Sequence, residues 1–472
     1  MGEGEAAKQL PRPWTDAEVR DALGLPRPAP DAPLLTSHSS IFTSVSTDTR
    51  TLTPGSLFVA LRGDRFDGHD HLVQARDAGA AAAVVREGTP SVDGLVLYPV
   101  SDTLHALGDL ARARRRGVTG PIVAVTGTNG KTSTKEMIAA VLRTRFPVHA
   151  TRANLNNLVG VPQTILEAPA GTEALVVEAG ANVPGEVGRY REIIEPCIAV
   201  VTNVGAGHLE GFGSLEGVMR EKLALVEGVE VAVVGTDPPA LAVVARARAV
   251  RTVTAGLDGA DVTPDRLDLD SLGRPAIGVD GVEIRLPYPG RHLAANAMLA
   301  WAVVRELDLD RAASAAALSA VVLPGGRTEV RQVGGLTLLN DCYNANPQSF
   351  RAAIETVRAM RDGRRLVVVA GTMRELGRES ARLHAEVAAD LVALEPDLLA
   401  VVGDFVPALA THARNLGDRL LTAGTPEELG PALAGRLRGD ELILLKASRG
   451  VALERLIPAL EAVVRTRNPG TS

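Results

Sequence analysis

One short run of residues has the types and spacing needed to hold phosphate groups. Segment 127–133 follows an apolar run and ends in Gly-Lys-Thr-Ser, with its first glycine three residues before the second, where the usual Walker pattern has five. Glycines let backbone N–H groups close around phosphate oxygens, the lysine reaches the β and γ phosphates, and the threonine hydroxyl binds Mg²⁺. A chance glycine turn is the alternative, but the flanking strand and helix patterns argue against it. We therefore expect ATP and Mg²⁺ as ligands, contacted by Gly127, Thr128, Asn129, Gly130, Lys131, Thr132 and Ser133.

Two further side chains follow apolar runs of the kind that form buried strands. Glu178 ends the run 174–178, and His208 comes shortly after the run 198–203. In open parallel sheets, ligands lie at the carboxyl ends of the strands, and phosphoryl transfer needs acidic or imidazole ligands for Mg²⁺. An unpaired carboxylate buried in such a place would be costly. We expect both residues in the site, with a hydrogen-bonded core histidine as the alternative for His208.

The elements that must position these residues follow from the other apolar runs. Strand-like runs before about residue 117, such as 55–61 and 80–85, predict a small α/β domain. The run 121–126, the loop and the helical stretch 132–142 form a phosphate-binding βα unit, and buried-strand runs alternating with helices predict a largely parallel sheet. After an expected hinge at 323–326, the apolar runs 366–370, 398–402 and 441–445 predict a dinucleotide-fold-like domain. The predicted fold class is α/β, with a small N-terminal α/β domain (1–118), a central P-loop parallel-sheet domain (119–324) and a C-terminal Rossmann-like domain (325–472).

Composition narrows the class of protein. The 472 residues carry a net charge of −6, which gives no basic field for a nucleic-acid backbone. The first fifteen residues are polar, without an apolar segment long enough for a signal peptide or a membrane span, so we expect a cytoplasmic protein with no membrane insertion. Cys197 and Cys342 lack the spacing of a zinc site or redox motif and are expected to be reduced, without a catalytic role.

Blocks of residues along nearly the whole chain resemble the Mur ligases. Gly127-Thr-Asn-Gly-Lys-Thr-Ser-Thr is similar to the nucleotide loop of this family, which also includes folylpolyglutamate synthase. The resemblance implies the three-domain Mur ligase architecture and ATP-dependent joining of D-alanyl-D-alanine to UDP-N-acetylmuramoyl-tripeptide, a step of peptidoglycan synthesis. The blocks that look like the D-alanyl-D-alanine-adding member are Asp48–Arg50, Phe66–His69, Asn156–Pro162, Glu178–Asn182, His208–Gly213, Gly326–Arg327 and Tyr343–Pro347.

The resemblance also implies metal ligands and a modified lysine. Glu178 and Thr132 would help to hold one Mg²⁺ and His208 a second one. At the position of Lys222, family members carry a lysine converted by CO₂ to a carbamate, and a plain surface lysine is the alternative. The expected catalytic set is Lys131, Glu178, His208 and Lys222.

Further contacts are carried over position by position. His292 and Asn296 resemble the adenine-contact block, while Arg327 and Asp341 resemble the groups that meet phosphate and ribose; a surface arginine is the alternative for Arg327. Asp67-Gly-His69 is compatible with either a capped turn or a ligand role. The residues expected to bind the UDP-linked peptide or the dipeptide are Thr49, Arg50, Asn157, Asn344, Asn346, Lys446 and Arg449.

Three positions depart from the family's pattern. Leu293 stands where the family usually has Asn, Leu158 where an acidic residue is common, and Thr372 where Asp precedes Met. The first concerns a base contact, the second the muramoyl contacts and the third a loop of the last domain.

Two rival functions stay open at this point. The tripeptide-forming relative adds a diamino acid, but it has a Tyr-Ala-His-Thr-Pro type block, and its diaminopimelate-using form has an Asp-Asn-Pro-Arg motif that is absent here. A nucleotide-binding regulator or motor ATPase would keep the loop without ligation, and Glu178, His208 and Lys222 together argue against it. We expect a monomer that acts as the D-alanyl-D-alanine-adding ligase.

Overall fold

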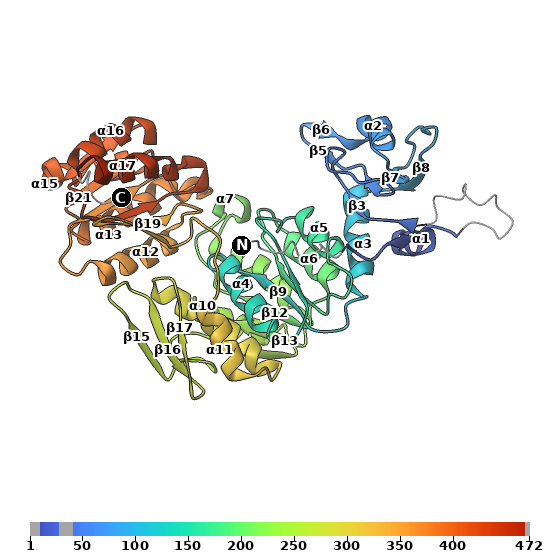
Figure 1. Ribbon diagram of the computed structural model, residues 1–472, viewed down its shortest axis with the longest axis horizontal. Helices are drawn as coiled ribbons and strands as arrows, with labels where there is room; N and C mark the ends of the chain where they lie inside the picture. The colour runs from blue at the N-terminus through green and yellow to red at the C-terminus, as the bar shows by residue number, and fades with distance from the viewer. Residues whose placement is uncertain (1–9, 28–40, 468–472) are drawn as a thin grey trace, which may run out of the picture.

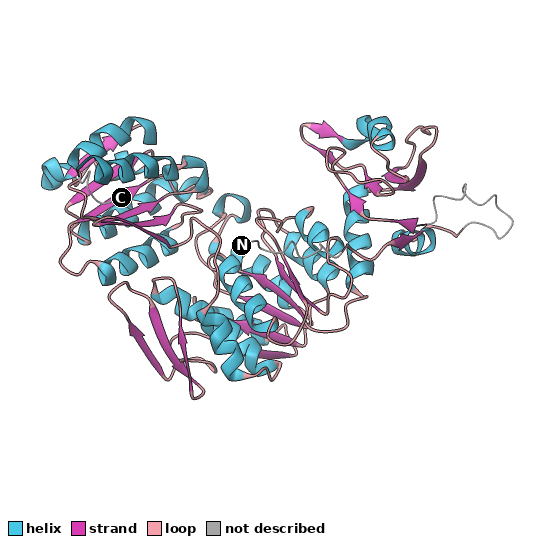
Figure 2. Ribbon diagram, in the orientation of Figure 1, coloured by secondary structure: helices cyan, strands magenta, loops and turns pink. Residues whose placement is uncertain are grey.

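The computed structural model describes residues 10–27 and 41–467, and it forms three lobes in chain order (Figure 1). Each lobe contains a mainly parallel sheet flanked by helices (Figure 2), which confirms the predicted α/β class. None of the helices among the described residues is long and apolar enough to cross a membrane. Most of the polar amino-terminal stretch lies outside the described residues. The predicted domain boundaries after residues 118 and 324 stay predictions.

The first lobe is built on a four-stranded parallel sheet of order β3-β4-β7-β8. Strand β4 lies in the predicted run 55–61, and β7 overlaps the predicted run 80–85 but extends one residue beyond it. Asp67 Oδ1 accepts a hydrogen bond from the His69 backbone N–H at 3.0 Å and caps a short 3-10 helix, so this block forms the capped turn. The elements are β1 (Trp14–Thr15), α1 (Asp16–Leu23), β2 (Ile41–Phe42), β3 (Val45–Ser46), β4 (Leu57–Val59), β5 (Arg62–Gly63), β6 (Phe66–Asp67), α2 (Leu72–Asp77), β7 (Ala82–Arg86), β8 (Val96–Val100) and α3 (Thr103–Arg115).

The central lobe has a six-stranded sheet of order β10-β11-β9-β12-β13-β14, with every neighbouring pair parallel. The inner strands β11, β9, β12 and β13 consist mostly of Val, Ile, Leu and Ala and are buried along their whole length, as strands of a parallel sheet covered by helices require. The strands are β9 (Ile122–Thr126), β10 (Val148–Ala150), β11 (Ala174–Glu178), β12 (Ile198–Val201), β13 (Val231–Val234) and β14 (Arg251–Thr254). The helices are α4 (Lys131–Leu142), α5 (Gly160–Leu166), α6 (Glu186–Ile194), α7 (Leu209–Phe212), α8 (Leu215–Leu223), α9 (Ala240–Arg246), α10 (Arg291–Glu306) and α11 (Arg311–Ser319).

A small antiparallel sheet, which the sequence analysis missed, is inserted before α10. It consists of β15 (Arg266–Leu269), β16 (Pro275–Val279) and β17 (Val282–Arg285). In Figure 1 it lies beside α10 and α11, below the C-terminal lobe. Its apolar side chains Ile277, Val279 and Ile284 join the core beneath α10.

The last lobe has a six-stranded sheet of order β18-β19-β23-β20-β21-β22, parallel except for the edge pair β18 and β19. The predicted runs 366–370 and 398–402 are β20 and β21, and the expected hinge lies in the irregular segment between α11 and β18. The strands are β18 (Glu329–Val333), β19 (Leu336–Asp341), β20 (Leu366–Ala370), β21 (Leu398–Val402), β22 (Leu420–Ala423) and β23 (Leu442–Lys446). The helices are α12 (Pro347–Met360), α13 (Ser380–Ala393), α14 (Phe405–Ala408), α15 (Ala413–Leu416), α16 (Pro426–Arg436) and α17 (Ile457–Arg467).

One carboxylate joins the first lobe to the central one. Glu195, at the end of α6, accepts hydrogen bonds from Arg112 Nε at 2.7 Å and Arg116 Nη2 at 2.6 Å, both on or just after α3. These two guanidinium groups hold the pKa of Glu195 at about 2. A hydrogen bond of 2.8 Å from Gln163 to Thr47 adds a second link. The first lobe is thus fixed to α5 and α6.

Candidate active site

The segment after β9 has the backbone shape of a phosphate loop. Gly127 and Gly130 have φ angles of 138° and 78°, which residues other than glycine rarely adopt. A Cβ on Gly127 would lie 2.0 Å from the Thr202 hydroxyl, and one on Gly130 would lie 2.6 Å from Asn296 Oδ1. Helix α4 begins at Lys131 without a side-chain cap. Its first N–H groups are therefore available to phosphate oxygens.

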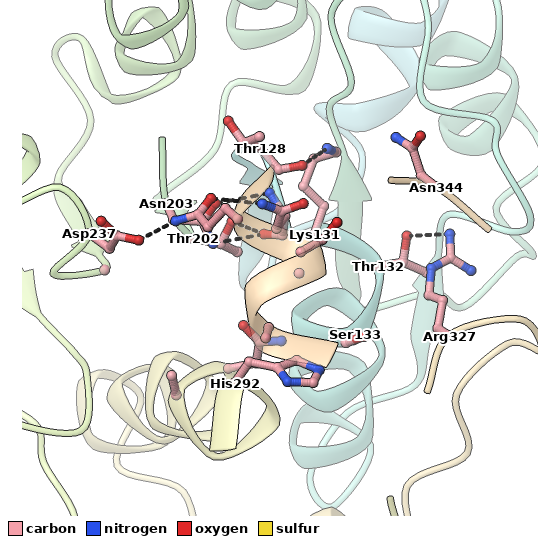
Figure 3. Close-up of a pocket in the computed structure, with 18 of the residues that line it drawn as sticks. Thr128, Lys131, Thr132, Ser133, Thr202, Asn203, Asp237, His292, Arg327 and Asn344 are labelled. Carbon is pink, nitrogen blue, oxygen red and sulfur yellow. Dashed lines mark hydrogen bonds between the residues drawn. The ribbon is translucent and has the colours of Figure 1, made fainter. Parts of the chain in front are cut away.

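The end of strand β12 holds this loop in place. The Asn203 carbonyl accepts from the Thr128 N–H at 2.9 Å, while Asn203 Oδ1 accepts from the Asn129 N–H at 2.9 Å. Thr202 Oγ1 donates to the Asn129 carbonyl at 2.5 Å. Asn203, which follows β12, therefore fixes the conformation of the loop through hydrogen bonds to its backbone (Figure 3).

Lys131 already folds over the loop. Its Nζ donates to the carbonyls of Gly127 at 2.8 Å and Thr128 at 3.0 Å. Burial lowers the pKa of the ammonium, and the nearby Glu178 carboxylate opposes this shift. When phosphates bind, the ammonium can exchange its hydrogen bonds to these carbonyls for stronger charge-assisted hydrogen bonds to phosphate oxygens.

The loop opens into a cavity of about 550 Å³ at the carboxyl ends of the central strands, where α10 and the C-terminal lobe complete the wall (Figure 3). This placement follows the rule for ligands of open parallel sheets. The cavity brings together most of the sequence-predicted residues: Thr128, Asn129, Gly130, Lys131, Thr132, Ser133, Asn157, Glu178, His208, His292, Asn296, Arg327, Asp341, Asn344 and Lys446.

Glu178 ends β11 at the edge of this cavity. Its Oε1 accepts from Asn156 Nδ2 at 2.9 Å, whereas Oε2 is buried without a hydrogen-bond partner. A buried carboxylate oxygen left unpaired is costly unless a cation meets it. The Glu178 oxygen thus fits a divalent cation at the phosphate loop. Within the described residues, however, no three His, Cys, Asp or Glu side chains form a metal-binding cluster, so phosphate oxygens or a modified side chain would have to supply further ligands.

Lys222 is fully buried on α8, so the surface-lysine alternative is wrong. Its Nζ has no hydrogen-bond partner and lies 5.7 Å from the centre of the Phe212 ring. Burial, together with the charge of Lys131, lowers the pKa of Lys222 to about 7. A large share of this amine is therefore neutral near pH 7, as attack on CO₂ requires.

His208 lines the cavity and also meets the C-terminal lobe. Its Nδ1 lies 2.6 Å from Glu375 Oε2, and its side chain is 20% exposed. The hydrogen bond from His208 lowers the pKa of Glu375. The histidine is therefore not an isolated core side chain: one ring nitrogen contacts a carboxylate of another lobe, and the ring borders the cavity.

The side of the cavity formed by α10 has the character expected for a base pocket. His292 is partly buried, desolvation lowers its pKa, and its Nδ1 has no hydrogen-bond partner. Asn296 packs against Gly130, and Leu293 lines the same wall. A neutral imidazole with an unused nitrogen can meet the edge of a purine.

Residues of the C-terminal lobe close the opposite side. Arg327 donates from Nη2 to Thr132 Oγ1 at 3.1 Å and stacks on the Tyr343 ring, 3.5 Å from its centre, so it is not a free surface arginine (Figure 3). Arg449 lies 5.3 Å from the same ring centre. Lys446 Nζ forms an ion pair with Asp341 Oδ2. The structure thus pairs Asp341, for which the resemblance implies a contact with the nucleotide, with Lys446, for which it implies a contact with the peptide substrates.

Polar side chains of α12 bind the phosphate loop directly. Asn129 Nδ2 donates to Gln348 Oε1 at 2.7 Å, and Asn346 Nδ2 donates to Asn129 Oδ1 at 2.7 Å. Asn346 Oδ1 also accepts from the Ser349 N–H at 2.9 Å and caps α12. In this conformation Asn346 links two lobes through the loop, rather than facing the cavity. Nearby, Asn344 lines the cavity.

The residues expected to bind the UDP-linked peptide are not all at this cavity. Thr49 and Arg50 lie in the first lobe, outside the cavity wall, and Arg50 pairs with Asp48 at 2.7 Å. Asn157 lines the cavity, but its Oδ1 accepts from the Gly160 N–H at 2.8 Å.

Three polar residues at the site were missed by the sequence analysis. Asp237 lines the cavity shortly after β13, so the rule that ligands lie at the carboxyl ends of parallel strands could have found it. Gln348 and Glu375 act across the boundary between lobes. No local pattern indicates such contacts.

Comparison with known proteins agrees with this geometry. Three family models match: "Mur ligase family, catalytic domain" over residues 41–115, "Mur ligase middle domain" over 125–304 and "Mur ligase, glutamate ligase domain" over 326–449. The UDP-N-acetylmuramoyl-tripeptide--D-alanyl-D-alanine ligase of Bacillus subtilis (strain 168) is 33% identical over 437 residues, which cover 90% of this chain and 94% of the relative. The chain belongs to the Mur ligase family.

Solved structures of the family superpose over nearly the whole chain. MurF from Acinetobacter baumannii is similar with a TM-score of 0.85 and 29% identity, covering 96% of this chain and 99% of that one. MurF ligase from Thermotoga maritima in complex with ADP gives a TM-score of 0.80 and 29% identity, covering 90% and 98%. The Mur ligase architecture predicted from the sequence is confirmed.

Proposed function

We propose that this Mur ligase joins D-alanyl-D-alanine to UDP-N-acetylmuramoyl-tripeptide at the expense of ATP and forms the pentapeptide precursor of peptidoglycan. The observation that carries the proposal is the cavity at the phosphate loop. It combines the loop lysine, a buried carboxylate with one oxygen that has no hydrogen-bond partner, and side chains of the C-terminal lobe. Relatives that bear this activity in their names, and that match over about nine tenths of both chains, support it.

The chemistry begins with a carboxylate, which is a poor electrophile because its charge is delocalised. One of its oxygens forms a bond to the γ-phosphorus of ATP as the bond to the bridging β–γ oxygen breaks and ADP leaves. The amine of the dipeptide then attacks the acyl carbon, the bond from that carbon to the phosphate oxygen breaks, and the amine gives its proton to solvent. With a pKa near 8, about one tenth of the amine is neutral at pH 7, so no dedicated strong base is required.

The side chains of this protein would neutralise charge and orient the reactants. Lys131 and the N–H groups at the start of α4 would hold the phosphates, and Arg327 would add a second cation beside Thr132. His292 and Asn296 would contact adenine, and Asp341 the ribose. Thr132, Glu178, His208 and a carbamylated Lys222 would bind Mg²⁺, which would screen the charge of the transferred phosphoryl group.

The peptide substrates would extend from the cavity to both outer lobes. Thr49, Arg50 and Asn157 would contact the UDP-linked end, and Asn344, Asn346, Lys446 and Arg449 the dipeptide side. Lys446 would exchange its Asp341 partner for the dipeptide carboxylate. A cytoplasmic monomer with these contacts would suffice for the reaction.

The choice of acceptor is the direct test of this function. In a phosphate-release assay with ATP, Mg²⁺ and UDP-N-acetylmuramoyl-tripeptide, we expect D-alanyl-D-alanine to stimulate release and free diaminopimelate to leave it at the rate without acceptor. Mass analysis should show the pentapeptide product. A parallel assay would replace the tripeptide substrate by UDP-N-acetylmuramoyl-dipeptide. Stimulation of phosphate release by diaminopimelate in that assay would instead identify the tripeptide-forming activity. Release that ignores every acceptor would indicate a plain ATPase.

A further inference from the structure

A carboxylate from the C-terminal lobe contacts the proposed metal-binding histidine. Glu375 lies in the loop between β20 and α13, whereas His208 precedes α7 of the central lobe. Their side chains meet at 2.6 Å between Glu375 Oε2 and His208 Nδ1. This contact leaves Nε2 as the ring nitrogen that can meet a ligand in the cavity.

The backbone around this pair is shaped for the contact. Both residues have positive φ angles, 57° for His208 and 64° for Glu375, which non-glycine residues adopt rarely. The Glu210 N–H donates to the Glu375 carbonyl at 3.2 Å, and Leu209 packs against the core of the C-terminal lobe. Such backbone conformations concentrate at functional sites, where the surrounding structure must hold them.

We propose that Glu375 is a positioning residue that orients His208 toward the metal and makes completion of the metal site depend on docking of the C-terminal lobe. The inference rests on the proposed function, because that function makes His208 a Mg²⁺ ligand. By accepting the Nδ1 proton, the carboxylate fixes the imidazole tautomer with Nε2 unprotonated and makes that nitrogen a better ligand. If the contact between Glu375 and His208 were only a surface ion pair, it would add slightly to the stability of lobe docking and would not affect metal binding.

Metal binding should reveal the role without any catalysis. Mn²⁺ would be titrated into protein saturated with a non-hydrolysable ATP analogue, with bound ion measured by electron paramagnetic resonance. We expect Glu375→Ala to weaken the His208-dependent Mn²⁺ site by about 10–100-fold, and Glu375→Gln, which keeps a hydrogen-bond acceptor, to weaken it less. The matched control is Glu379→Gln in the same segment, whose side chain pairs only with Arg382 among the described contacts.

A double-mutant comparison separates this proposal from the proposed function. His208→Ala should weaken the same Mn²⁺ site, and adding Glu375→Ala to it should weaken binding little further, since the carboxylate acts through the histidine. If His208→Ala weakens Mn²⁺ binding and Glu375→Ala does not, the positioning role is wrong while the metal ligand stands. If neither variant changes binding, His208 is no ligand and both assignments fail, although acceptor-dependent ligation would still be measured independently. Thermal unfolding of each variant would show that the fold is retained.

Discussion

Lys131→Ala should lower the turnover of acceptor-dependent phosphate release by a factor of about 10²–10³ or more while the protein stays folded. The Lys131 side chain is partly buried at the start of α4, and its ammonium donates to loop carbonyls, so its charge is available for the phosphates. Charge on the transferred phosphoryl group must be neutralised as its bond to ADP breaks. Loss of the lysine removes stabilisation that is largest in the transition state.

The loss of turnover in Lys131→Ala can be distinguished from damage to helix α4 with a control variant. Arg143→Ala, at the exposed far end of α4, is the matched control and should retain wild-type turnover. Circular dichroism and thermal unfolding would compare the folds of both variants. If Lys131→Ala retained more than a tenth of the wild-type turnover, the assignment of this lysine would be wrong.

The parallel sheets could be predicted because their strands are read locally. Runs such as 174–178 and 366–370 are short, apolar and rich in β-branched residues, and the structure has strands with these bounds. The phosphate loop was equally local, because glycines with positive φ and the following lysine occupy one short segment. Side chains at the ends of these strands were therefore found together with the strands themselves.

The antiparallel sheet β15 to β17 was missed because its pattern is weaker. Its strands alternate apolar and polar residues, as in Arg266–Leu269, and they cover α10 with one face only. Period-two alternation over only four or five residues is near the lower limit of length at which the pattern indicates a half-buried strand. The sheet is specified mainly by packing against a helix that follows it in the chain.

The contacts between lobes could not be predicted for a different reason. Gln348 and Glu375 have no local signal, because their partners Asn129 and His208 lie on a different lobe. Only the docked arrangement of the C-terminal lobe brings them to the phosphate loop. Burial of Lys222 was likewise hidden, since its helix α8 carries both exposed and buried charges.

Lys222 should work as a carbamate, because the Mg²⁺ that His208 would help to hold needs an anionic oxygen ligand, which an imidazole does not supply. Carbamate formation is balanced within the site: the neutral Nζ forms a bond to the carbon of CO₂, one C=O π bond becomes a C–O⁻ group, and the nitrogen releases a proton to solvent. The lowered pKa of Lys222, about 7, makes the neutral amine available. An unmodified ammonium would repel a divalent cation. It would also be a buried charge without a hydrogen-bond partner, which is costly.

Lys222→Ala should therefore lower turnover by a factor of about 10²–10³, comparable with the loss of another group that stabilises the transferred phosphoryl charge. A small added carboxylate should restore part of the rate by supplying an anionic oxygen in the vacated space, whereas it should not help Lys131→Ala. Arg220→Ala, exposed on the same helix, is the matched control and should behave like wild type. Protein equilibrated with ¹³C-bicarbonate should show a carbamate carbon signal in NMR spectra that is missing from Lys222→Ala. A variant rate within a few-fold of wild type, or a wild-type spectrum without that signal, would show that Lys222 acts as a plain amine.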